Sequence, residues 1–263
     1  MEMRIAVFQF GSNEDIEKNF AAIKRAITQA FENKVRLLVF HECAICGYPP
    51  IETDITKIDF GLLDTRTKEI QQLAKGHDMY IALGTIRRDE EKLFNSITLI
   101  NPRGEMMGSY DKRALWGWDL ENFAKGDSPG IYEIDGIKAG FRICYEIRFP
   151  EYFRELFKAK AELCFVSFSD TSDNDLFDRY EVIKSHLSTR AVENVMTVFS
   201  VNSISKYQTA LTAVFGINGR IVKEAPKNEE NLLVFDYSTP EIDYEARGRI
   251  KNSVDALRTG FYI

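Results

Sequence analysis

Short apolar runs of strand length alternate with amphipathic stretches of helix length along most of the chain, and this alternation restricts the possible folds. The run VRLLVF (35–40) has the length and apolar content of a strand buried on both faces. We expect strands of the same kind at 3–10 (MRIAVFQF), 79–86 (MYIALGTI) and 163–168 (LCFVSF). Strands that alternate with helices indicate an α/β domain in which helices cover large mixed sheets.

Helical stretches separate these strands. The first is expected after Ser12 and Asn13, which are suitable N-cap residues, because apolar residues then recur every three or four positions. Pro150 suits the first position of another helix, which we expect to end near Lys160. Further helices are expected at about 64–76, 176–194 and 239–258. No linker or repeat divides the sequence, so we expect one domain over residues 1–263.

Composition and charge exclude several classes of protein. Of the 263 residues, 44% are hydrophobic and 28% charged, as in ordinary soluble globular proteins. The net charge of −6 at pH 7 argues against nucleic acid as a partner, since phosphates repel a surface of that sign. No apolar run approaches the roughly 18 residues needed to cross a bilayer, so no membrane partner is expected. The chain begins with an apolar strand rather than a basic region, which favours a cytoplasmic protein.

Residues that follow strands are the first candidates for function, because ligands of open α/β sheets bind beyond the carboxyl ends of the strands. Glu42 follows the run at 35–40, and Cys144 follows the expected strand IKAGFRI. Ser169 and Asp170 follow LCFVSF, and Asn202 ends VMTVFSVN. A carboxylate and a thiol therefore occupy equivalent places at the sheet edge.

The segment HECAICGYPP (41–50) holds Cys43 and Cys46 in a Cys-x-x-Cys spacing, which can indicate zinc or redox chemistry. Structural zinc usually needs a second ligand pair, and the sequence has no second Cys-x-x-Cys. A redox pair needs a helix N-terminus, whereas Cys46 runs into the turn GYPP. We therefore expect two packed thiols, a structural His41 and no metal site.

Position alone leaves two interpretations of Glu42 and of Cys144. Glu42 is either a solvent-facing strand terminus or a partly desolvated carboxylate, whose pKa would then suit a general base. Cys144 is either a buried thiol or a nucleophile on a strand–turn–helix elbow, where free N–H groups can hold an oxyanion. Lys112 is either a surface charge or a cation that favours the thiolate. The loop SFSDTSDND, with Ser169, either lines a pocket or is solvated.

Three segments together resemble the nitrilase superfamily of carbon–nitrogen hydrolases: LLVFHECAICGY, YDKRALW and GFRICYEIRFPE. Their order is that of the family, with Lys112 70 residues after Glu42 and Cys144 32 residues after Lys112. STRAVENVMTV also resembles a later segment of the family, so the resemblance spans nearly the whole chain.

The resemblance implies a four-layer α-β-β-α sandwich, usually paired into homodimers or larger homo-oligomers. It also implies that Cys144 is the nucleophile, Glu42 the general base and Lys112 an electrostatic stabiliser. Many members hold a second glutamate near the lysine, and Glu121, nine residues after Lys112, occupies the matching place, where it would position that lysine or assist proton transfer. The N–H of Tyr145 would share the oxyanion with Lys112.

Two residues depart from the family pattern. Proline commonly precedes the catalytic glutamate, and this chain has His41 there. An aspartate often stands where this chain has Glu146. Neither belongs to the implied triad, although His41 can affect how Glu42 is aimed.

The resemblance implies hydrolysis of a small-molecule amide through a thioester, with no metal or organic cofactor. Arg148 either pairs with a substrate carboxylate, as in an ω-amidase, or braces the elbow by binding a backbone carbonyl or an internal acid. A nitrilase or an N-carbamoyl amine hydrolase would use the same residues. A catalytically silent binding protein is the remote alternative.

Overall fold

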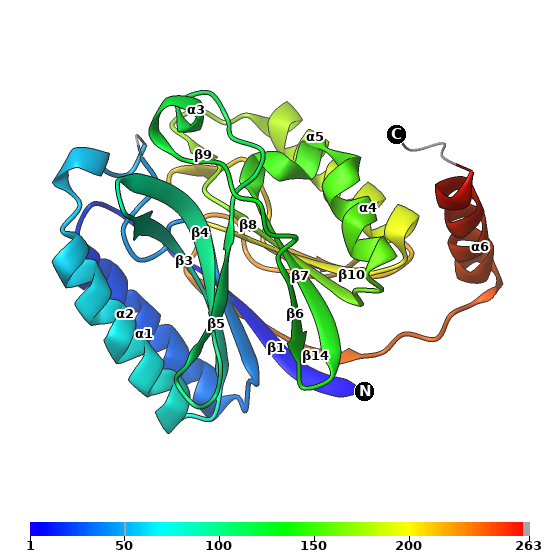
Figure 1. Cartoon of the computed structure of the whole chain (residues 1–263), viewed down its shortest axis with the longest axis horizontal. Coiled ribbons are helices and arrows are strands. Elements are labelled where there is room, and N and C mark those ends of the chain that lie inside the picture. Colours follow the sequence, from blue (N-terminus) through cyan, green and yellow to red (C-terminus); the bar gives the residue numbers. More distant parts are fainter. Residues whose placement is uncertain (50, 260–263) are drawn as a thin grey trace.

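The computed structural model describes residues 1–49 and 51–259, which form two six-stranded sheets packed face to face (Figure 1). The first sheet has the strand order β14-β1-β2-β3-β4-β5. Its strands are β1 (Glu2–Gln9), β2 (Leu37–Phe40), β3 (Tyr80–Asp89), β4 (Lys92–Ile100), β5 (Met106–Asp111) and β14 (Asn231–Ser238). β1, β2 and β3 are parallel to one another, and the remaining neighbours are antiparallel.

The second sheet has the strand order β13-β12-β10-β8-β7-β6. Its strands are β6 (Ile131–Ile134), β7 (Ile137–Ile143), β8 (Leu163–Phe168), β10 (Thr197–Asn202), β12 (Ala213–Phe215) and β13 (Ile221–Glu224). The central strands β7, β8 and β10 are parallel, so their carboxyl ends lie at one edge. A short pair, β9 (Thr171–Ser172) with β11 (Tyr207–Gln208), lies outside both sheets.

Helices cover the outer face of each sheet and complete four layers (Figure 1). α1 (Ile16–Glu32) and α2 (Phe60–Gly76) lie on the first sheet, and α4 (Pro150–Lys158) and α5 (Phe177–Asn194) lie on the second. The shorter helices are η1 (Ile55–Lys57), α3 (Asp119–Asn122) and η2 (Cys144–Arg148). The predicted α-β-β-α sandwich is therefore confirmed.

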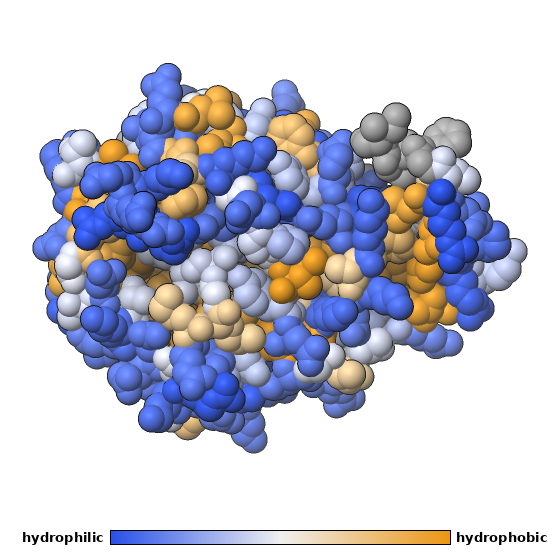
Figure 2. All heavy atoms as spheres, viewed as in Figure 1, coloured by the Kyte–Doolittle hydropathy of each residue, from blue (hydrophilic) through white to orange (hydrophobic). Residues whose placement is uncertain are grey.

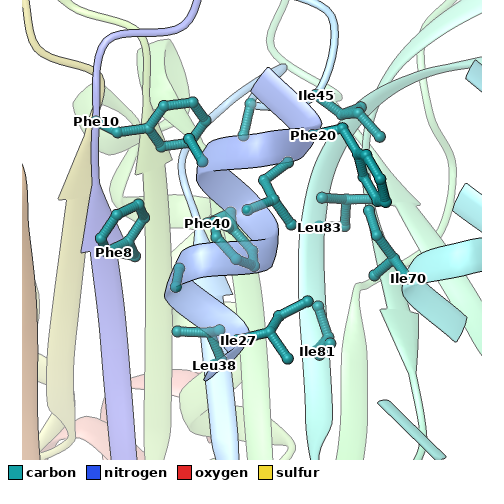
Figure 3. Close-up of a cluster of buried hydrophobic side chains, with 14 of the residues drawn as sticks. Phe8, Phe10, Phe20, Ile27, Leu38, Phe40, Ile45, Ile70, Ile81 and Leu83 are labelled. Carbon is teal, nitrogen blue, oxygen red and sulfur yellow. The ribbon is translucent and has the colours of Figure 1, made fainter. Parts of the chain in front are cut away.

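Three apolar clusters hold the layers together. Between the sheets, the rings of Phe141, Phe165 and Phe199 stack in series at centroid distances of 5.3 and 5.0 Å. On the outer side of the first sheet, Phe40 and Ile81 contact the buried face of α1, as Figure 3 shows. The central strands β2, β8 and β10 are thus buried on both faces, which explains why they are mostly apolar runs.

The last helix, α6 (Tyr244–Arg258), lies at the margin of the sandwich (Figure 1). Its apolar residues Ile250, Val254 and Leu257 line a cavity of about 600 Å³ between the helix and the second sheet's helical layer. Apolar side chains gather in this part of an otherwise mainly polar face (Figure 2). No helix in the described part of the chain is long and apolar enough to cross a membrane.

Several local expectations need correction. The N-cap of α1 is Asp15, whose carboxylate accepts the N–H groups of Glu17 and Lys18, rather than Ser12 or Asn13. The observed cap of α1 thus lies three residues beyond Ser12 and two beyond Asn13. The strand expected at 35–40 spans only Leu37–Phe40, although the main chain of Arg36 still forms hydrogen bonds with Arg4 and Tyr80.

Candidate active site

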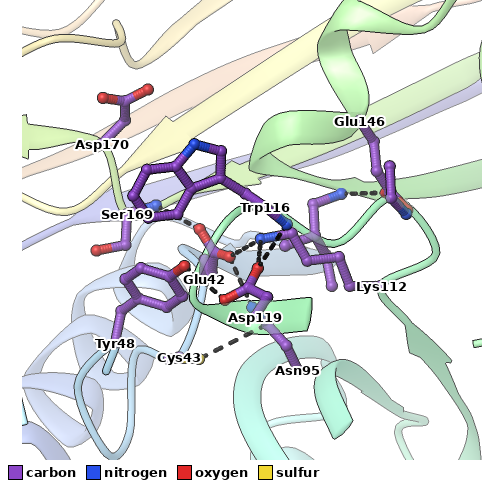
Figure 4. A network of polar contacts seen from close by, with 12 residues as sticks. Glu42, Cys43, Tyr48, Asn95, Lys112, Trp116, Asp119, Glu146, Ser169 and Asp170 are labelled. Atoms are coloured by element: carbon purple, nitrogen blue, oxygen red, sulfur yellow. Dashed lines mark hydrogen bonds and ion pairs between the residues drawn. The ribbon is translucent and has the colours of Figure 1, made fainter. Parts of the chain in front are cut away.

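Four candidate residues follow strand ends at one edge of the sandwich. Glu42 follows β2, Lys112 follows β5, Cys144 follows β7 and Ser169 follows β8. Lys112, Cys144 and Ser169 line one cavity of about 240 Å³, and Glu42 lies behind it in contact with Lys112 and Ser169. Segments from both sheets thus converge on one site, as Figure 4 shows for Glu42, Lys112 and Ser169.

Glu42 is fully buried. Of the two interpretations of its position, a solvent-facing strand terminus or a desolvated carboxylate, the second is therefore correct. Its Oε1 accepts hydrogen bonds from Lys112 Nζ at 2.9 Å and from Asn95 Nδ2 at 2.7 Å. Its Oε2 accepts the N–H of Ser169 at 2.8 Å. Burial raises the pKa of the Glu42 carboxyl, and the charge of Lys112 opposes that rise. A carboxylate with a raised pKa and three fixed donors is suited to take up and return a proton.

Lys112 is also buried and lies between two carboxylates (Figure 4). Its Nζ donates to Asp119 Oδ2 at 2.7 Å as well as to Glu42. Burial alone would lower the pKa of Lys112, but the nearby Glu42, Cys144 and Asp119 raise it above its ordinary value. Lys112 therefore remains a cation, and its head group is fixed by two acceptors.

Asp119 takes the place beside Lys112 that the sequence analysis assigned to Glu121. The Glu121 side chain is exposed on α3, and within the described chain its carboxylate forms no ion pair with Lys112. Successive helical residues are rotated by about 100°, so residues two apart point to nearly opposite sides. Asp119 and the buried Phe123 are four apart and share the inward side. The apolar Phe123 four positions after Asp119 is the sequence signal that favours Asp119 over Glu121.

Tyr48 and Trp116 complete the surroundings of Asp119. The hydroxyl of Tyr48 donates to Asp119 Oδ1 at 2.7 Å, and the main-chain N–H of Trp116 donates to Asp119 Oδ2 at 3.4 Å. The Tyr48 ring lies with its centroid 5.5 Å from Lys112 Nζ. Both residues also line the cavity. Tyr48 and Trp116 therefore hold Asp119 through hydrogen bonds and form part of the wall.

Cys144 begins η2 at the end of β7 with a φ of +45°, a conformation that non-glycine residues rarely adopt. The expected strand–turn–helix elbow thus contains a turn of 3-10 helix between β7 and α4. The first N–H groups of such a turn have no acceptor within it, and that of Tyr145 is one of them. Burial raises the pKa of the Cys144 thiol, and the charge of Glu42 raises it further. The thiol is therefore protonated at neutral pH until a base accepts its proton.

Glu146 fixes the elbow against the segment that carries Lys112. Its Oε2 accepts the N–H of Ile143 at 2.7 Å, and its Oε1 accepts the N–H of Arg113 and the hydroxyl of Tyr110, both at 2.7 Å. Since Arg113 directly follows Lys112, one buried carboxylate sets the distance between the cysteine and lysine segments. The longer side chain in place of the family's aspartate is fully satisfied here.

Arg148 lines the cavity and forms no hydrogen bond to a carbonyl or an acid within the described residues. Its guanidinium carbon lies 5.8 Å from the centroid of the Tyr145 ring. The bracing contact that was one alternative for Arg148 is made instead by Arg190, whose Nε and Nη2 donate to the carbonyl of Ile147 at 3.1 and 3.0 Å. Arg148 therefore presents a cation to the cavity.

Much of the remaining polar wall comes from the loop after β8. Of the two alternatives for this loop, a pocket wall or a solvated segment, the structure shows the pocket wall. Asp170 pairs with Arg179 through two hydrogen bonds of 2.9 and 2.7 Å, and Thr209 also donates to it. The apolar part of the wall consists of Tyr48, Ile51, Trp116, Tyr145, Ile147, Leu176 and Ile183.

The two cysteines of the Cys-x-x-Cys segment are buried and packed. Cys43 Sγ lies 3.6 Å from Asn95 Oδ1, and Cys46 Sγ lies 3.8 Å from the carbonyl of Cys43. The rings of His41 and Phe10 are tilted against each other with their centroids 4.7 Å apart, and burial lowers the pKa of His41 to about 4. No cluster of three or more His, Cys, Asp or Glu residues within 1–49 and 51–259 is arranged to hold a metal ion.

Fold and sequence together define a carbon–nitrogen hydrolase. A family model described as carbon-nitrogen hydrolase matches residues 4–250. The chain therefore belongs to the carbon-nitrogen hydrolase family, within the nitrilase superfamily that its three motifs resemble.

Several known proteins are similar to this chain. The (R)-stereoselective amidase of a Pseudomonas species is 26% identical over 97% of this chain and 90% of its own length. The 2-oxoglutaramate amidase of Bacillus subtilis is 26% identical over 73% of this chain and 74% of its own length. The glutamine-dependent NAD(+) synthetase of Aquifex aeolicus is 27% identical over 83% of this chain, which spans only 39% of that protein.

The fold is also that of a solved structure. The crystal structure of an amidase from Nesterenkonia sp. has a TM-score of 0.83 and 22% identity, with 98% of this chain and 96% of that chain covered. This likeness extends over both sheets and their helical layers, in agreement with the four-layer sandwich.

Proposed function

We propose that this protein is an amidase that hydrolyses the C–N bond of a small amide through a thioester on Cys144. The observation that carries the proposal is the buried Glu42–Lys112–Asp119 cluster, whose Lys112 lines one small cavity together with Cys144. Membership of the family supports hydrolysis of a carbon–nitrogen bond. The two similar proteins named as amidases support an amide as the substrate class.

In the acylation half, Glu42 accepts the proton of the Cys144 thiol while the sulfur attacks the carbonyl carbon of the amide. A C–S bond forms and the carbonyl oxygen becomes an oxyanion. Lys112 Nζ and the N–H of Tyr145 donate to this oxyanion, where loss of one donor typically costs about 3 kcal/mol of transition-state stabilisation. The C–N bond then breaks, Glu42 returns its proton to the departing nitrogen, and ammonia leaves a thioester behind.

In the deacylation half, water enters the position that ammonia has left. Glu42 accepts a proton from this water as its oxygen attacks the thioester carbon, and the same two donors hold the second oxyanion. The C–S bond breaks, the proton on Glu42 passes to the sulfur, and the carboxylic acid leaves. Asp119 holds Lys112 as a cation throughout and aims its ammonium at the oxyanion position.

The substrate in this proposal carries a carboxylate at the end remote from the amide. Arg148 supports this, because it presents a cation to the cavity with no acidic partner among the described residues. A cavity of about 240 Å³ suits a small molecule. Ser169 would contribute a polar side chain to the same wall. The similarity to a 2-oxoglutaramate amidase favours an ω-amidase over an amidase for neutral amides.

The test is release of ammonia from a panel of small amides, nitriles and N-carbamoyl compounds, with Cys144→Ala measured beside the native protein. We expect amides with a distal carboxylate to be hydrolysed and Cys144→Ala to be inactive. Carbon dioxide released together with ammonia would point to an N-carbamoyl amine hydrolase, and preference for nitriles to a nitrilase. Equal rates for the native protein and the variant would contradict thiol catalysis, and a native protein that binds panel amides without releasing ammonia would support the binding-protein alternative.

We further propose a homodimer or larger homo-oligomer, which the family resemblance implies and the apolar cavity beside α6 supports. Light scattering of the purified protein measures the mass directly, and a mass of a single chain at micromolar concentration would contradict this proposal. A cytoplasmic location remains a prediction from the sequence.

A further inference from the structure

Glu52 is a carboxylate near the site to which the mechanism above gives no part. It lies in the segment between β2 and η1, and four donors surround its two oxygens. Oε2 accepts the hydroxyl of Ser12 at 2.6 Å and the N–H of Tyr48 at 2.9 Å. Oε1 accepts the hydroxyl of Ser203 at 2.7 Å and that of Ser169 at 3.3 Å.

The surroundings of Glu52 contain donors and no cation. None of the ion pairs within the described part of the chain involves this carboxylate, in contrast to the pair of Glu42 with Lys112. Burial raises the pKa of Glu52, and the three hydroxyl groups and the Tyr48 N–H oppose this rise. Glu52 is half-buried, and a carboxylate even partly removed from water without a counter-ion is costly to a fold. Such a group is therefore expected where its hydrogen bonds serve the site.

Two of the four donors belong to residues that hold the catalytic cluster. The N–H of Ser169 donates to Glu42 Oε2 at 2.8 Å, while its hydroxyl donates to Glu52. The hydroxyl of Tyr48 donates to Asp119 at 2.7 Å, while its N–H donates to Glu52. Glu52 is thus one residue removed from the proposed base on one side and from the acid that holds Lys112 on the other.

The other two donors come from the two different sheets. Ser12 follows β1 of the first sheet, and Ser203 follows β10 of the second. Glu42 likewise follows a strand of the first sheet, whereas Ser169 follows a strand of the second. The Glu52 carboxylate therefore joins the same two sheet edges across which Ser169 must reach Glu42.

We propose that Glu52 is a positioning residue that holds the Ser169 N–H on Glu42 and the Tyr48 hydroxyl on Asp119. This inference rests on the proposed role of Glu42 as the base. Without Glu52, Glu42 loses a fixed donor to its ionised form, and loss of such a donor raises the pKa of a carboxyl. Since the base works in its ionised form, the acid limb of the activity profile moves to higher pH.

The experiment compares Glu52→Ala and Glu52→Gln with the native protein in the pH profile of kcat/KM. The glutamine side chain has the same shape, its oxygen accepts the Tyr48 N–H, and its NH₂ group donates to serine hydroxyls that then act as acceptors. We expect Glu52→Ala to lose at least about 10-fold in kcat, with KM within about threefold and the acid limb raised by about one pH unit. Glu52→Gln is expected to restore most of kcat and the native limb.

Glu91→Ala is the matched control, because it makes the same substitution at an exposed glutamate, between β3 and β4. We expect its kcat and acid limb to be those of the native protein. A folded Glu52→Ala with native kcat and a native limb would overturn the proposal. Equal losses in the folded Ala and Gln variants would also overturn it, since shape and hydrogen bonding would then not account for the effect.

A second measurement separates this proposal from the proposed amidase function. The rate at which iodoacetamide alkylates Cys144, located by mass spectrometry, depends on proton acceptance by Glu42 and needs no turnover. Its acid limb is expected to rise in Glu52→Ala and remain native in Glu52→Gln, even if no compound of the panel is hydrolysed. If Glu52→Ala does not fold, Glu52→Asp replaces it, because the shorter side chain withdraws the carboxylate from the four donors. A native limb in folded Glu52→Asp would again overturn the proposal.

Discussion

Lys112 Nζ lies 2.9 Å from Glu42 Oε1, and both side chains are closed to solvent. Asp119 lies 2.7 Å from the same ammonium, so two buried carboxylates share one cation. A buried charge that loses its partner is left desolvated and unpaired, which typically costs several kcal/mol. The fold is therefore expected to depend on all three charges being present together.

Removal of the shared cation is expected to destabilise the protein. Lys112→Met should lower the free energy of unfolding by about 3–5 kcal/mol at pH 7, because Glu42 and Asp119 lose their partner. The difference in free energy of unfolding between Lys112→Met and the native protein should become smaller as the pH falls, because a protonated carboxyl carries no charge to be neutralised. Urea denaturation at several pH values measures both effects. Lys125→Met, at an exposed position, should change stability by less than about 0.5 kcal/mol. A Lys112→Met protein as stable as the native one would contradict the buried pair.

The pH dependence of activity should reflect the burial of Glu42. Burial raises the pKa of this carboxyl, and the proposed base acts only when ionised. As the pH falls through the raised pKa, kcat/KM should therefore fall, with an acid limb above the ordinary glutamate pKa of about 4.3. Initial rates between about pH 4 and pH 8 with a good substrate measure the limb. Full activity retained down to the ordinary glutamate pKa would be inconsistent with a desolvated base.

Asp119 and Glu121 form a matched pair for testing which acid serves Lys112. Asp119→Asn should reduce kcat by about 100-fold or more, because Lys112 loses one of the carboxylates that hold and aim it. Glu121→Gln should remain within about twofold of the native protein, since that side chain is exposed. The two variants differ from native by the same chemical change, and kcat at saturating amide is the readout. A larger loss of kcat in Glu121→Gln than in Asp119→Asn would instead favour Glu121 as the acid that serves Lys112.

Arg148 should determine preference for carboxylated substrates. Arg148→Met is expected to raise KM for an amide with a distal carboxylate by about 10-fold or more, while neutral amides change little, because a charge-assisted hydrogen bond is lost only with the former. Arg190→Lys is the control, since Arg190 braces the elbow through the Ile147 carbonyl and should affect both amides alike. Equal weakening of both amides by Arg148→Met would refute recognition of the carboxylate.

Local pattern in the sequence was sufficient for much of the architecture. Apolar runs of strand length predicted β1, β3 and β8, because strands buried on both faces need continuous apolar side chains. Because ligands of α/β sheets bind beyond the carboxyl ends of strands, Glu42 and Ser169 were candidates for one site, and they meet at 2.8 Å. They follow strands of different sheets, so the packing of the two sheets brings them together. The lysine and cysteine followed from motif order rather than from periodicity.

Where several neighbouring residues could have filled the same role, the sequence did not show which one does. The cap of α1 was misplaced because Ser12, Asn13 and Asp15 are all good N-caps, and the choice depends on which of them other contacts use. Ser12 is used by Glu52, which leaves Asp15 to cap the helix. Likewise, both Asp119 and Glu121 are acids near Lys112 in the chain, and the orientation of α3 selects Asp119.

The sequence by itself determined the order of strands and helices and which chemical groups follow the strands. Only the tertiary structure decided how those groups are held. Asn95 lies 53 residues from Glu42 in the chain, and Ser203 lies 151 residues from Glu52, yet each pair is joined by a hydrogen bond of 2.7 Å. The first contact joins β4 to the segment after β2 within one sheet, and the second joins the segments after β2 and β10 of the two different sheets. Only the folded sheets, packed face to face, bring these distant segments together and close them to water. Local propensities extend over a few residues and contain no record of these distances.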